Sequence, residues 1–371
     1  MMAFSRTERG LLARWWWTVD HGLLAGIGLL ALSGLVFVLA SSPPVAARLG
    51  LPALHFALRH GAFLLPAAFL LLGCSLLSPT GVRRLASGLL ALTLAMLALT
   101  LLIGPEIKGA TRWLPIGGML IQPSEFIKPA LVVMVAALLA RAPGLTNALP
   151  AVLLVGLVLI LLLSQPDVSM ALTVATLFGV QLFVAGLPWL LVLGLAAVGL
   201  LALWQAYVFF PHVAERFDRF LDPESGDHYQ VGLALEAVRG AAWFGSGPGE
   251  GRVKYALPDA HSDFVFAVIA EEFGVIACLA VLALFGFVLL RGVRRVEMVA
   301  DRFAFLAAAG LIALFGLQSI VNLGVNLSLL PATGMTLPFI SYGGSSLCAL
   351  ALGMGLFLAL TRRRPSAEMA P

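Results

Sequence analysis

The residue best placed for chemistry is an aspartate at the boundary between a polar and an apolar stretch. Asp263 ends the segment LPDAHSD and directly precedes an apolar run from Phe264 to Leu290. A carboxylate at such a boundary is partly desolvated yet still reached by water, which suits a general base. The same position also suits an anion that stabilises the first turn of a helix. Position alone leaves both interpretations open.

Two more carboxylates, Glu271 and Glu272, lie about two helical turns further along the same run. An acidic side chain at the centre of a membrane helix costs about 2.5 to 3.5 kcal/mol, so it tends to face a cavity or a partner. Adjacent residues on a helix point about 100° apart. We therefore expect these two glutamates to have different partners.

A loop with two cations and a tryptophan forms another candidate region. Its sequence is KGATRWL, which contributes Lys108, Arg112 and Trp113. The segment QPSEFIKP follows and predicts the start of a helix, with Glu125 and Lys128 on one face and within reach of an ion pair. That pair either faces a polar cavity or only reaches the lipid headgroups.

The long polar stretch before Asp263 holds a glycine-rich turn, WFGSGPGEG, followed by Arg252 and Lys254. Backbone amides in such a turn could cradle a pyrophosphate. The glycine spacing matches neither a Walker nor a Rossmann motif and favours an ordinary turn. His261 could orient Asp263, although a single histidine without ligand spacing indicates a hydrogen-bonded loop residue rather than a metal ligand.

The last polar stretch, LPATGMTLPFISYGGSS, lies at 330–346. Its density of glycine, proline and serine between two apolar segments predicts irregular backbone at the membrane surface. Such backbone is tolerated only where protein or a wet cavity covers it. A structural re-entrant loop and a substrate-lining loop both fit. The short sequence QPD at 165–167 predicts a tight turn with a helix-start carboxylate.

The composition shows which elements must position these residues. The 371 residues are 60% hydrophobic and 11% charged, with a mean hydropathy of +1.00. Such a chain is a polytopic membrane protein of the all-α class. Its net charge of +4 does not indicate nucleic acid, because the basic residues sort by side of the membrane. Cys74, Cys278 and Cys348 lie in apolar segments without metal-ligand spacing and are expected to be buried thiols.

Hydropathy and length predict ten transmembrane helices. They fall near 22–40, 56–77, 85–103, 124–140, 149–163, 168–186, 189–210, 264–290, 303–325 and 343–361. We find no internal repeat and read 1–371 as a single membrane domain.

The basic residues set the expected orientation. Placing both termini in the cytoplasm puts most arginines on the inner side, as the positive-inside rule requires. They are Arg6, Arg9, Arg14, Arg83, Arg84, Arg141, Arg291, Arg294, Arg295, Arg302 and Arg362 to Arg364. Residues 1–21 then form a cytoplasmic N-terminus with an interfacial anchor at Trp15 to Trp17, and 362–371 form a cytoplasmic tail expected to be disordered. The large outer loop, 211–263, joins the seventh and eighth helices, and the polar motifs face outward.

Taken in order, these motifs resemble the SEDS family of bacterial membrane glycosyltransferases. The resemblance covers essentially the whole chain and rests on KGATRWL, QPSEFIK, QPD, GPGEG followed by VK, LPDAHSDFVFAVIAEEFG and GMTLPFISYGGSS. The forms GPGEG-x-VK with LPDAH, and GMTLPFISYGGSS, are more similar to the cell-division branch than to the elongation branch. Ser262 stands where the family usually has threonine, and Val168-Ser169 follow QPD where Phe-Gly is common.

The resemblance implies a ten-helix enzyme that polymerises lipid II at the outer face of the cytoplasmic membrane, by inverting transfer with Asp263 as the catalytic base. We expect the substrate to meet a set of polar and basic residues on that side. The set is Arg112, Trp113, Gln122, Ser124, Glu125, Lys128, Arg252, Lys254, His261, Ser341, Gly343, Gly344 and Ser345.

The same resemblance implies the partners. They are lipid II, a class B penicillin-binding protein with transpeptidase activity, regulators of the division complex and membrane lipids, with no nucleic acid. No cofactor or metal site is demanded by the sequence, although a divalent cation, Mg²⁺ or Mn²⁺, could assist.

Three alternatives stay open. A lipid II flippase fits ten helices with charges inside the membrane, although the polar residues crowd the outer end rather than the midplane. A scaffold for other division proteins would leave the region around Asp263 free to vary. An elongation-type polymerase would share the chemistry and differ in its cellular role.

Overall fold

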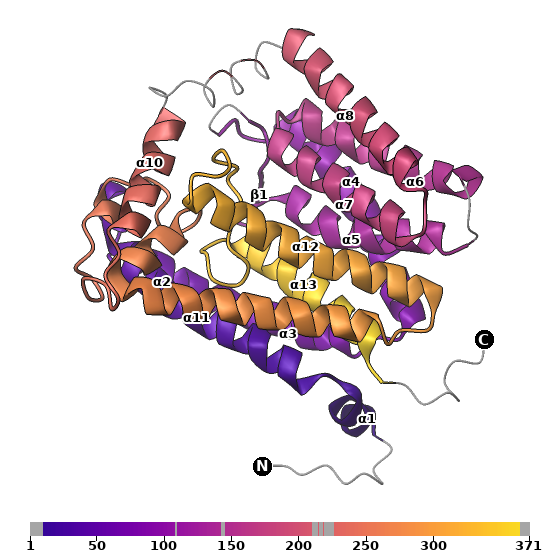
Figure 1. The fold of residues 1–371 in the computed structure, drawn as a ribbon, viewed down its shortest axis with the longest axis horizontal. Helices are drawn as coiled ribbons and strands as arrows, with labels where there is room; N and C mark the ends of the chain where they lie inside the picture. Colours follow the sequence, from indigo (N-terminus) through magenta and orange to yellow (C-terminus); the bar gives the residue numbers. More distant parts are fainter. Residues whose placement is uncertain are drawn as a thin grey trace.

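The computed structural model describes residues 10–107, 110–141, 145–209, 214, 218 and 226–363. Lys108, the first nine residues, most of 210–225 and the tail from Arg364 lie outside the described residues, so the expectations for those parts are not addressed. The described chain is a bundle of long helices with one small hairpin (Figure 1).

The elements follow one another in this order. The helices are α1 (Leu11–Thr18), α2 (His21–Arg48), α3 (His55–Ser75), α4 (Pro79–Ile103), α5 (Pro123–Leu139), α6 (Leu145–Ser164), α7 (Val168–Val184), α8 (Trp189–Phe209), α10 (Gly226–Arg239), α11 (Val265–Val296), α12 (Arg302–Asn326) and α13 (Gly344–Thr361), with a 3₁₀ turn η1 (Val253–Tyr255). The antiparallel strands β1 (Leu114–Ile116) and β2 (Met119–Ile121) form the hairpin between α4 and α5.

Each of the ten predicted apolar segments falls on a helix, α2 to α8 and α11 to α13. Among the described residues, six helices are long and apolar enough to cross a membrane: α2, α3, α4, α11, α12 and α13. The chain is a multi-pass membrane protein. Two helices were not predicted, because α1 spans only eight residues and α10 lies inside the long polar stretch.

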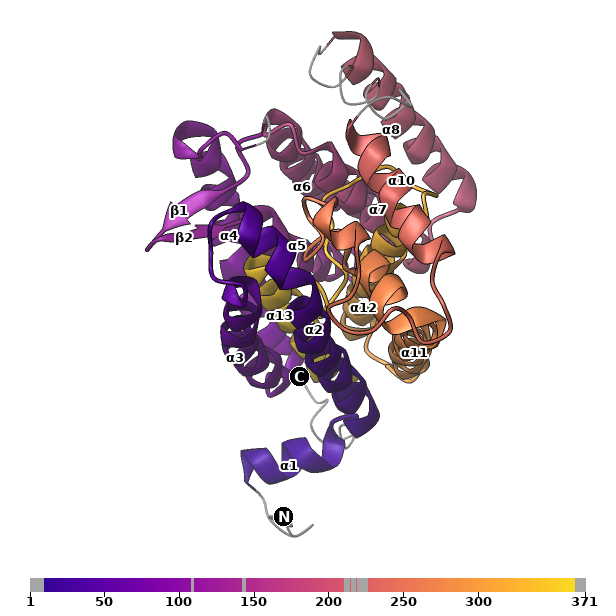
Figure 2. The same ribbon diagram turned by 90° about the vertical axis from the view of Figure 1, so that its left-hand side faces the viewer.

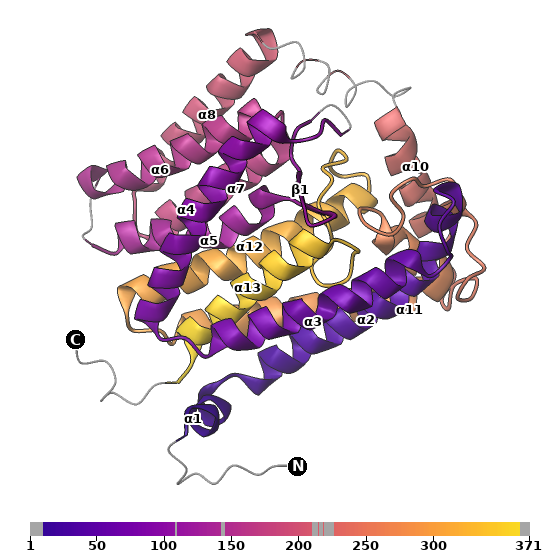
Figure 3. The same cartoon turned by 180° about the vertical axis from the view of Figure 1, so that it is seen from behind.

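The centre of the bundle is formed by α5, α12 and α13. Most residues of α12 and α13 are buried, whereas the outer helices expose many leucines, as lipid-facing helices do. Figures 1 and 3 show α2, α3 and α11 on one side of this centre and α4, α6, α7 and α8 on the other. Cys74, Cys278 and Cys348 are buried free thiols, as expected.

Helix α2 is longer than predicted because it continues through Pro43 and Pro44. A proline lacks the N–H that would bond the carbonyl four residues earlier. For Pro44 that carbonyl belongs to Ala40, and the ammonium of Lys254 donates to it over 3.2 Å. A side chain from the segment between α10 and α11 therefore replaces the missing helix bond.

Helix α11 is broken at Gly274, where φ is 79° and ψ is −176°. In an unbroken helix the carbonyls of Glu271 and Glu272 would accept from Val275 and Ile276. Here those carbonyls accept from Ser246 (2.9 Å) and Gly247 (3.1 Å) of the glycine-rich turn instead.

The other half of the broken ladder is satisfied in the same way. The N–H groups of Val275 and Ile276 donate to the carbonyls of Ala242 (3.0 Å) and Trp243 (3.3 Å). The backbones approach so closely that a Cβ on Gly274 would lie 2.4 Å from the nitrogen of Gly245. The segment from Ala242 to Gly247 thus supplies the backbone hydrogen bonds that the break in α11 leaves open.

The stretch between α12 and α13 re-enters the bundle. Met335 and the residues from Leu337 to Ser341 are buried, and Phe339 adopts a left-handed φ of 63°. The carbonyl of Phe339 presses against α2, where a Cβ on Gly34 would lie 2.4 Å from it. Protein therefore covers the part of this irregular backbone from Leu337 to Ser341.

A buried carboxylate ties the N-terminal end of α2 to the C-terminal end of α11. Asp20 caps α2 by accepting from the N–H of Leu23 at 2.9 Å, and it pairs with Arg291 at 2.6 Å and with Arg295. Burial raises the pKa of Asp20, but the bonds from Arg291, Leu23 and Arg295 outweigh burial and hold this pKa below the ordinary 3.8. A carboxyl group whose pKa is lowered by folding stabilises the folded protein at pH values above its ordinary pKa. This stabilisation is lost as the pH falls through the pKa of the folded state.

We expect Asp20→Ala to lower the unfolding midpoint of the detergent-solubilised protein more than Asp20→Asn does. Alanine removes the cap, worth about 1 kcal/mol, and leaves two arginines without their counter-ion, whereas asparagine keeps a cap acceptor. Thermal unfolding at pH 7 measures both variants. Glu297→Gln, at the exposed end of α11, is the control, and equal midpoints for all three would contradict the assigned role.

Candidate functional site

Asp263 lies where the start of α11 meets the loop before α13. It is partly exposed, and its backbone N–H donates to the carbonyl of Asp259 at 3.0 Å. A Cβ built on Gly334 would lie 3.9 Å from its Oδ2 atom, so this loop forms one wall beside the carboxylate. Its backbone carbonyl accepts from two buried amides of α12, those of Asn322 and Asn326.

His261 belongs to a small aromatic cluster beside this aspartate. Its ring lies 4.2 Å from that of Phe56 on α3 and 5.2 Å from that of Tyr342, and its carbonyl accepts from the N–H of Tyr342 at 2.9 Å. Burial raises the pKa of Tyr342, although Arg59 acts in the opposite direction. His261 therefore contributes packing and a backbone tie between the two polar motifs.

A chain of hydroxyl contacts connects this loop to the starts of α13 and α5. The hydroxyls of Thr336 and Ser346 lie 2.7 Å apart, and the hydroxyl of Ser345 accepts from the N–H of Gln122 at 3.1 Å. Gln122 also donates to Ser124 at 3.1 Å. The structure thus joins two of the motifs that the sequence placed more than 200 residues apart.

The remaining predicted residues of the last motif support this turn. The hydroxyl of Ser341 accepts from the N–H of Leu337 at 2.9 Å. Gly343 is the N-cap of α13, and a Cβ there would lie 3.0 Å from Thr336. A Cβ on Gly344 would lie 2.6 Å from the ring of Phe63 on α3, so both glycines allow close packing.

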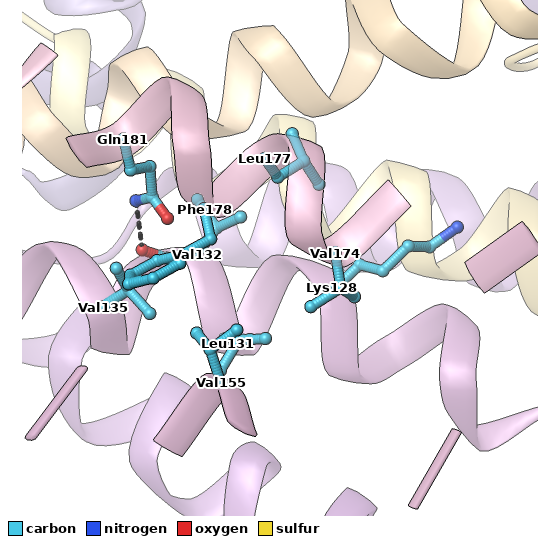
Figure 4. Close-up of a pocket in the computed structure, with 9 residues that line it drawn as sticks. All are labelled: Lys128, Leu131, Val132, Val135, Val155, Val174, Leu177, Phe178 and Gln181. Carbon is cyan, nitrogen blue, oxygen red and sulfur yellow. Dashed lines mark hydrogen bonds between the residues drawn. The ribbon is translucent and has the colours of Figure 1, made fainter. Parts of the chain in front are cut away.

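Glu125 and Lys128 form the predicted ion pair, with 2.9 Å between Oε2 and Nζ. Both side chains are buried in the bundle, at 5% and 2% exposure, so the pair does not merely reach the lipid headgroups. The stem of Lys128 lines one end of a small apolar cavity between α5, α6 and α7, and Gln181 lies at the other (Figure 4). The ammonium points away from the apolar lining.

Arg112 and Trp113 lie just before β1. The guanidinium of Arg112 contacts Asp167 at 3.4 Å, and Asp167 also caps α7 through the N–H of Met170. Figure 2 shows the hairpin and α10 toward the end of the bundle opposite α1. Among the described residues, the structure brings Arg112 to Asp167 rather than to Asp263.

The glycine-rich turn is organised by the two glutamates of α11. The Glu271 carboxylate accepts from the N–H groups of Arg252 (2.6 Å) and Val253 (3.0 Å), and Glu272 accepts from Gly249 (2.8 Å). Glu272 also pairs with Lys254. The two glutamates have different partners, as expected. The backbone N–H groups that donate to them are not available to a pyrophosphate, which favours the ordinary turn over a pyrophosphate cradle.

The two cations of this region differ in availability. Lys254 is 1% exposed and binds Glu272 together with the carbonyls of Ala40 and Gly249, so it acts as a structural cation in this geometry. The side chain of Arg252 is exposed. Of this pair, Arg252 is therefore the cation open to a ligand.

Sequence reasoning missed three residues that hold the site. Arg48 at the end of α2 donates to the carbonyls of Leu257 and Pro258. Asn322 and Asn326 hold the carbonyl of Asp263. The asparagines had a signal, since they are two amides four residues apart in an apolar helix and therefore lie on one face.

The arrangement can supply a base at a fixed position. A partly exposed carboxylate lies beside the loop at Gly334, and cations occur at the same end of the molecule. Within the described ranges, no three His, Cys, Asp or Glu side chains gather to hold a metal ion.

Comparison with known proteins places this architecture in a family. The family model described as cell cycle protein, which covers FtsW, RodA and SpoVE, matches residues 21–365. A protein of Caulobacter vibrioides named probable peptidoglycan glycosyltransferase FtsW is 43% identical over 369 residues, covering 98% of this chain and 95% of that protein. One of the same name from Hydrogenovibrio crunogenus is 37% identical, covering 92% and 91%.

Solved structures share the fold. A chain from work on structural coordination of polymerization and crosslinking by a peptidoglycan synthase complex matches with a TM-score of 0.77 and 32% identity, over 92% of this chain and 97% of that one. The rod shape determining protein RodA of Thermus thermophilus matches with a TM-score of 0.70 and 31% identity, over 93% and 97%. The chain therefore belongs to the FtsW, RodA and SpoVE family, the SEDS family that its motifs resemble, and it is of the FtsW type.

Proposed function

We propose that this chain is a peptidoglycan glycosyltransferase that polymerises lipid II into glycan strands during septal cell-wall synthesis. The observation that carries the proposal is the placement of Asp263, a partly exposed carboxylate held beside the loop at Gly334. The relatives are peptidoglycan glycosyltransferases by name, which supplies the class of reaction.

In the proposed reaction Asp263 accepts the proton of the acceptor's sugar 4-hydroxyl while that oxygen attacks the anomeric carbon of the donor. The bond from this carbon to the pyrophosphate breaks on the opposite face, so the configuration inverts. The leaving group departs as polyprenyl pyrophosphate once its charge is stabilised, and no second carboxylic acid is needed.

The proposal assigns the pyrophosphate to the cations of the outer end. The side chain of Arg112 is partly exposed and Arg252 is exposed, and guanidinium groups suit phosphate oxygens. Lys128 is held by Glu125 and would act at shorter range, within the bundle. A divalent cation, Mg²⁺ or Mn²⁺, could share this task.

The proposed topology places ten spans, α2 to α8 and α11 to α13, in the cytoplasmic membrane, with the loop 211–263 outside between the seventh and eighth. Contacts among inner-side residues support it, because Arg362 donates to the carbonyl of Leu77, Arg83 stacks on Phe303, and Arg295 pairs with Asp20. Arginines gathered at one end of a bundle indicate its cytoplasmic side. The site then faces the periplasm.

The proposed partners are lipid II, membrane lipids, a class B penicillin-binding protein and regulators of the division complex. The similar chain in a peptidoglycan synthase complex supports a transpeptidase partner, since that complex couples polymerization to crosslinking by its description. The printed names of the relatives favour the division role over the elongation role of RodA.

A lipid II flippase is the second candidate, and the break in α11 is the observation on its side. Transporters often place broken helices around a substrate at the midplane. Here the groups freed at Gly274 bond the backbone from Ala242 to Gly247 rather than line a passage. This pairing favours the polymerase.

Replacing Asp263 by Asn should lower the rate of glycan polymerisation by about a hundredfold or more, because the amide keeps the shape but cannot accept the proton. The assay uses purified lipid II and the full-length protein reconstituted with its transpeptidase. Asp259→Asn, four residues away, is the matched control and should stay within about threefold of wild type.

Near-normal strand synthesis by the Asp263→Asn protein would remove the base from the proposal. If neither wild type nor variant makes strands while lipid II crosses the bilayer in a parallel assay, the flippase takes over.

The buried pair Glu125 and Lys128 offers a second test. Lys128→Met alone should destabilise the protein by about 3 to 5 kcal/mol, because a buried carboxylate loses its counter-ion. Adding Glu125→Gln should restore most of the stability. If the ammonium also serves the pyrophosphate, the double variant folds normally but stays at least about tenfold slower than wild type.

Thermal unfolding and lipid II polymerisation measure the two effects separately. Full activity of the double variant would restrict the pair to a structural role.

A further inference from the structure

We propose that Asn322 and Asn326 on α12 are positioning residues that fix Asp263 against the loop before α13. The inference rests on the proposed role of Asp263 as the base and adds how that base is held. Both asparagines are buried, at 1% and 0% exposure.

Asn322 joins the two backbones that flank the carboxylate. Its Nδ2 atom donates to the carbonyl of Asp263 at 3.0 Å and to the carbonyl of Met335 at 2.6 Å. Met335 directly follows Gly334, the residue that walls the carboxylate. One side chain therefore sets the distance between the base and the wall beside it.

Asn326 fixes the start of α11 from outside that helix. Phe264, the N-cap residue, provides no side-chain cap, and the N–H of Ala267 in the first turn is shared between the carbonyl of Phe264, at 3.1 Å, and an acceptor on α12. The Oδ1 atom of Asn326 accepts from the N–H of Ala267 at 3.1 Å, while its Nδ2 atom donates to the carbonyl of Asp263 at 3.0 Å. Asn326 therefore ties the first turn of α11 to α12 through a donor and an acceptor.

The two amides also support each other. The Nδ2 atom of Asn326 donates to the carbonyl of Asn322 at 2.9 Å. The oxygens of Asp263, Met335 and Asn322 are all carbonyls, so only the amino ends of the amides can face them. A side chain so constrained has one orientation, which is what a positioning residue requires.

A purely structural role would also explain buried amides, because an unpaired carbonyl in the bundle is costly. The two roles differ in what a substitution changes. Loss of a positioning residue misplaces the base, and a displacement of about 1 Å can cost about a hundredfold in rate without weakening substrate binding. Loss of a structural residue lowers the stability of the protein without a specific loss of kcat.

The test compares Asn322→Leu, which is similar in size and has no donor, with Asn322→Ser, which keeps one hydroxyl donor. Gln181→Met is the matched control, because Gln181 is also a buried amide whose Nε2 atom donates to a backbone carbonyl, that of Val132. Gln181 lies near the C-terminal end of α7, whereas Asp167 caps the N-terminal end of that helix. The full-length proteins are reconstituted with their transpeptidase, and kcat, KM for lipid II and the unfolding midpoint are measured.

Asn322→Leu should lower kcat at least about tenfold with KM within about twofold of wild type. The kcat of Asn322→Ser should lie between that of wild type and that of Asn322→Leu. Gln181→Met should keep kcat within about twofold at a comparable change in midpoint. Wild-type kcat in Asn322→Leu, or an equal loss of kcat in the control, would overturn the positioning role.

A second arm separates this inference from the proposed function. In the Asp263→Asn background, Asn322→Leu should cause no further loss in single-turnover rate, because the amide acts through the carboxylate. A further tenfold loss there means that Asn322 acts independently, which overturns positioning and leaves the enzyme intact. A near-normal Asp263→Asn protein instead removes the base, and this inference with it.

Discussion

Backbone hydrogen bonding in a medium without water is the constraint on which this structure depends. Wherever a membrane helix is interrupted, its freed carbonyl and amide groups need partners from the protein itself. The break at Gly274 is filled by the turn from Ala242 to Gly247, and the carbonyl left open by Pro44 is filled by Lys254. The segment between α10 and α11 is therefore part of the framework of the bundle.

The same constraint explains why Asp263 is placed so definitely. The aspartate lies at the start of a helix, and such starts expose amides that need acceptors. Asn326 supplies one acceptor from α12, and both asparagines satisfy the carbonyl of Asp263. The side chain of Asp263 remains partly exposed while its backbone is fully engaged, which combines access for a substrate with a fixed position.

The sequence allowed much of this to be predicted. Hydropathy located ten segments that all fall on helices, and the spacing of Glu125 and Lys128 predicted their ion pair. Hydropathy could not reveal that α2 continues through Pro43 and Pro44, because the compensating Lys254 lies more than 200 residues away. Periodicity is a local property, and these compensations are made by tertiary contacts.

The candidate site was predicted less completely for a related reason. Residue types predicted Asp263 as the base, which stays a prediction, and they could not separate an exposed cation from one buried in an ion pair. Lys254 and Arg252 are two residues apart, yet one is buried against Glu272 and the other is exposed. Asn322 and Asn326 carry no charge, and their importance follows only from the carbonyls that they meet.

The backbone hydrogen bonds between the glycine-rich turn and the break in α11 also bear on how the protein is synthesised and folds. Glu271 and Glu272 would enter the membrane as costly charges if α11 inserted alone. Their partners, from Ser246 to Lys254, precede them by only about 20 residues, so closing this loop costs little entropy. The turn and the helix can therefore be synthesised as one unit, in which Lys254 pairs with Glu272 and backbone N–H groups hydrogen-bond Glu271, and the ammonium of Lys254 then reaches α2, made much earlier, when the bundle closes.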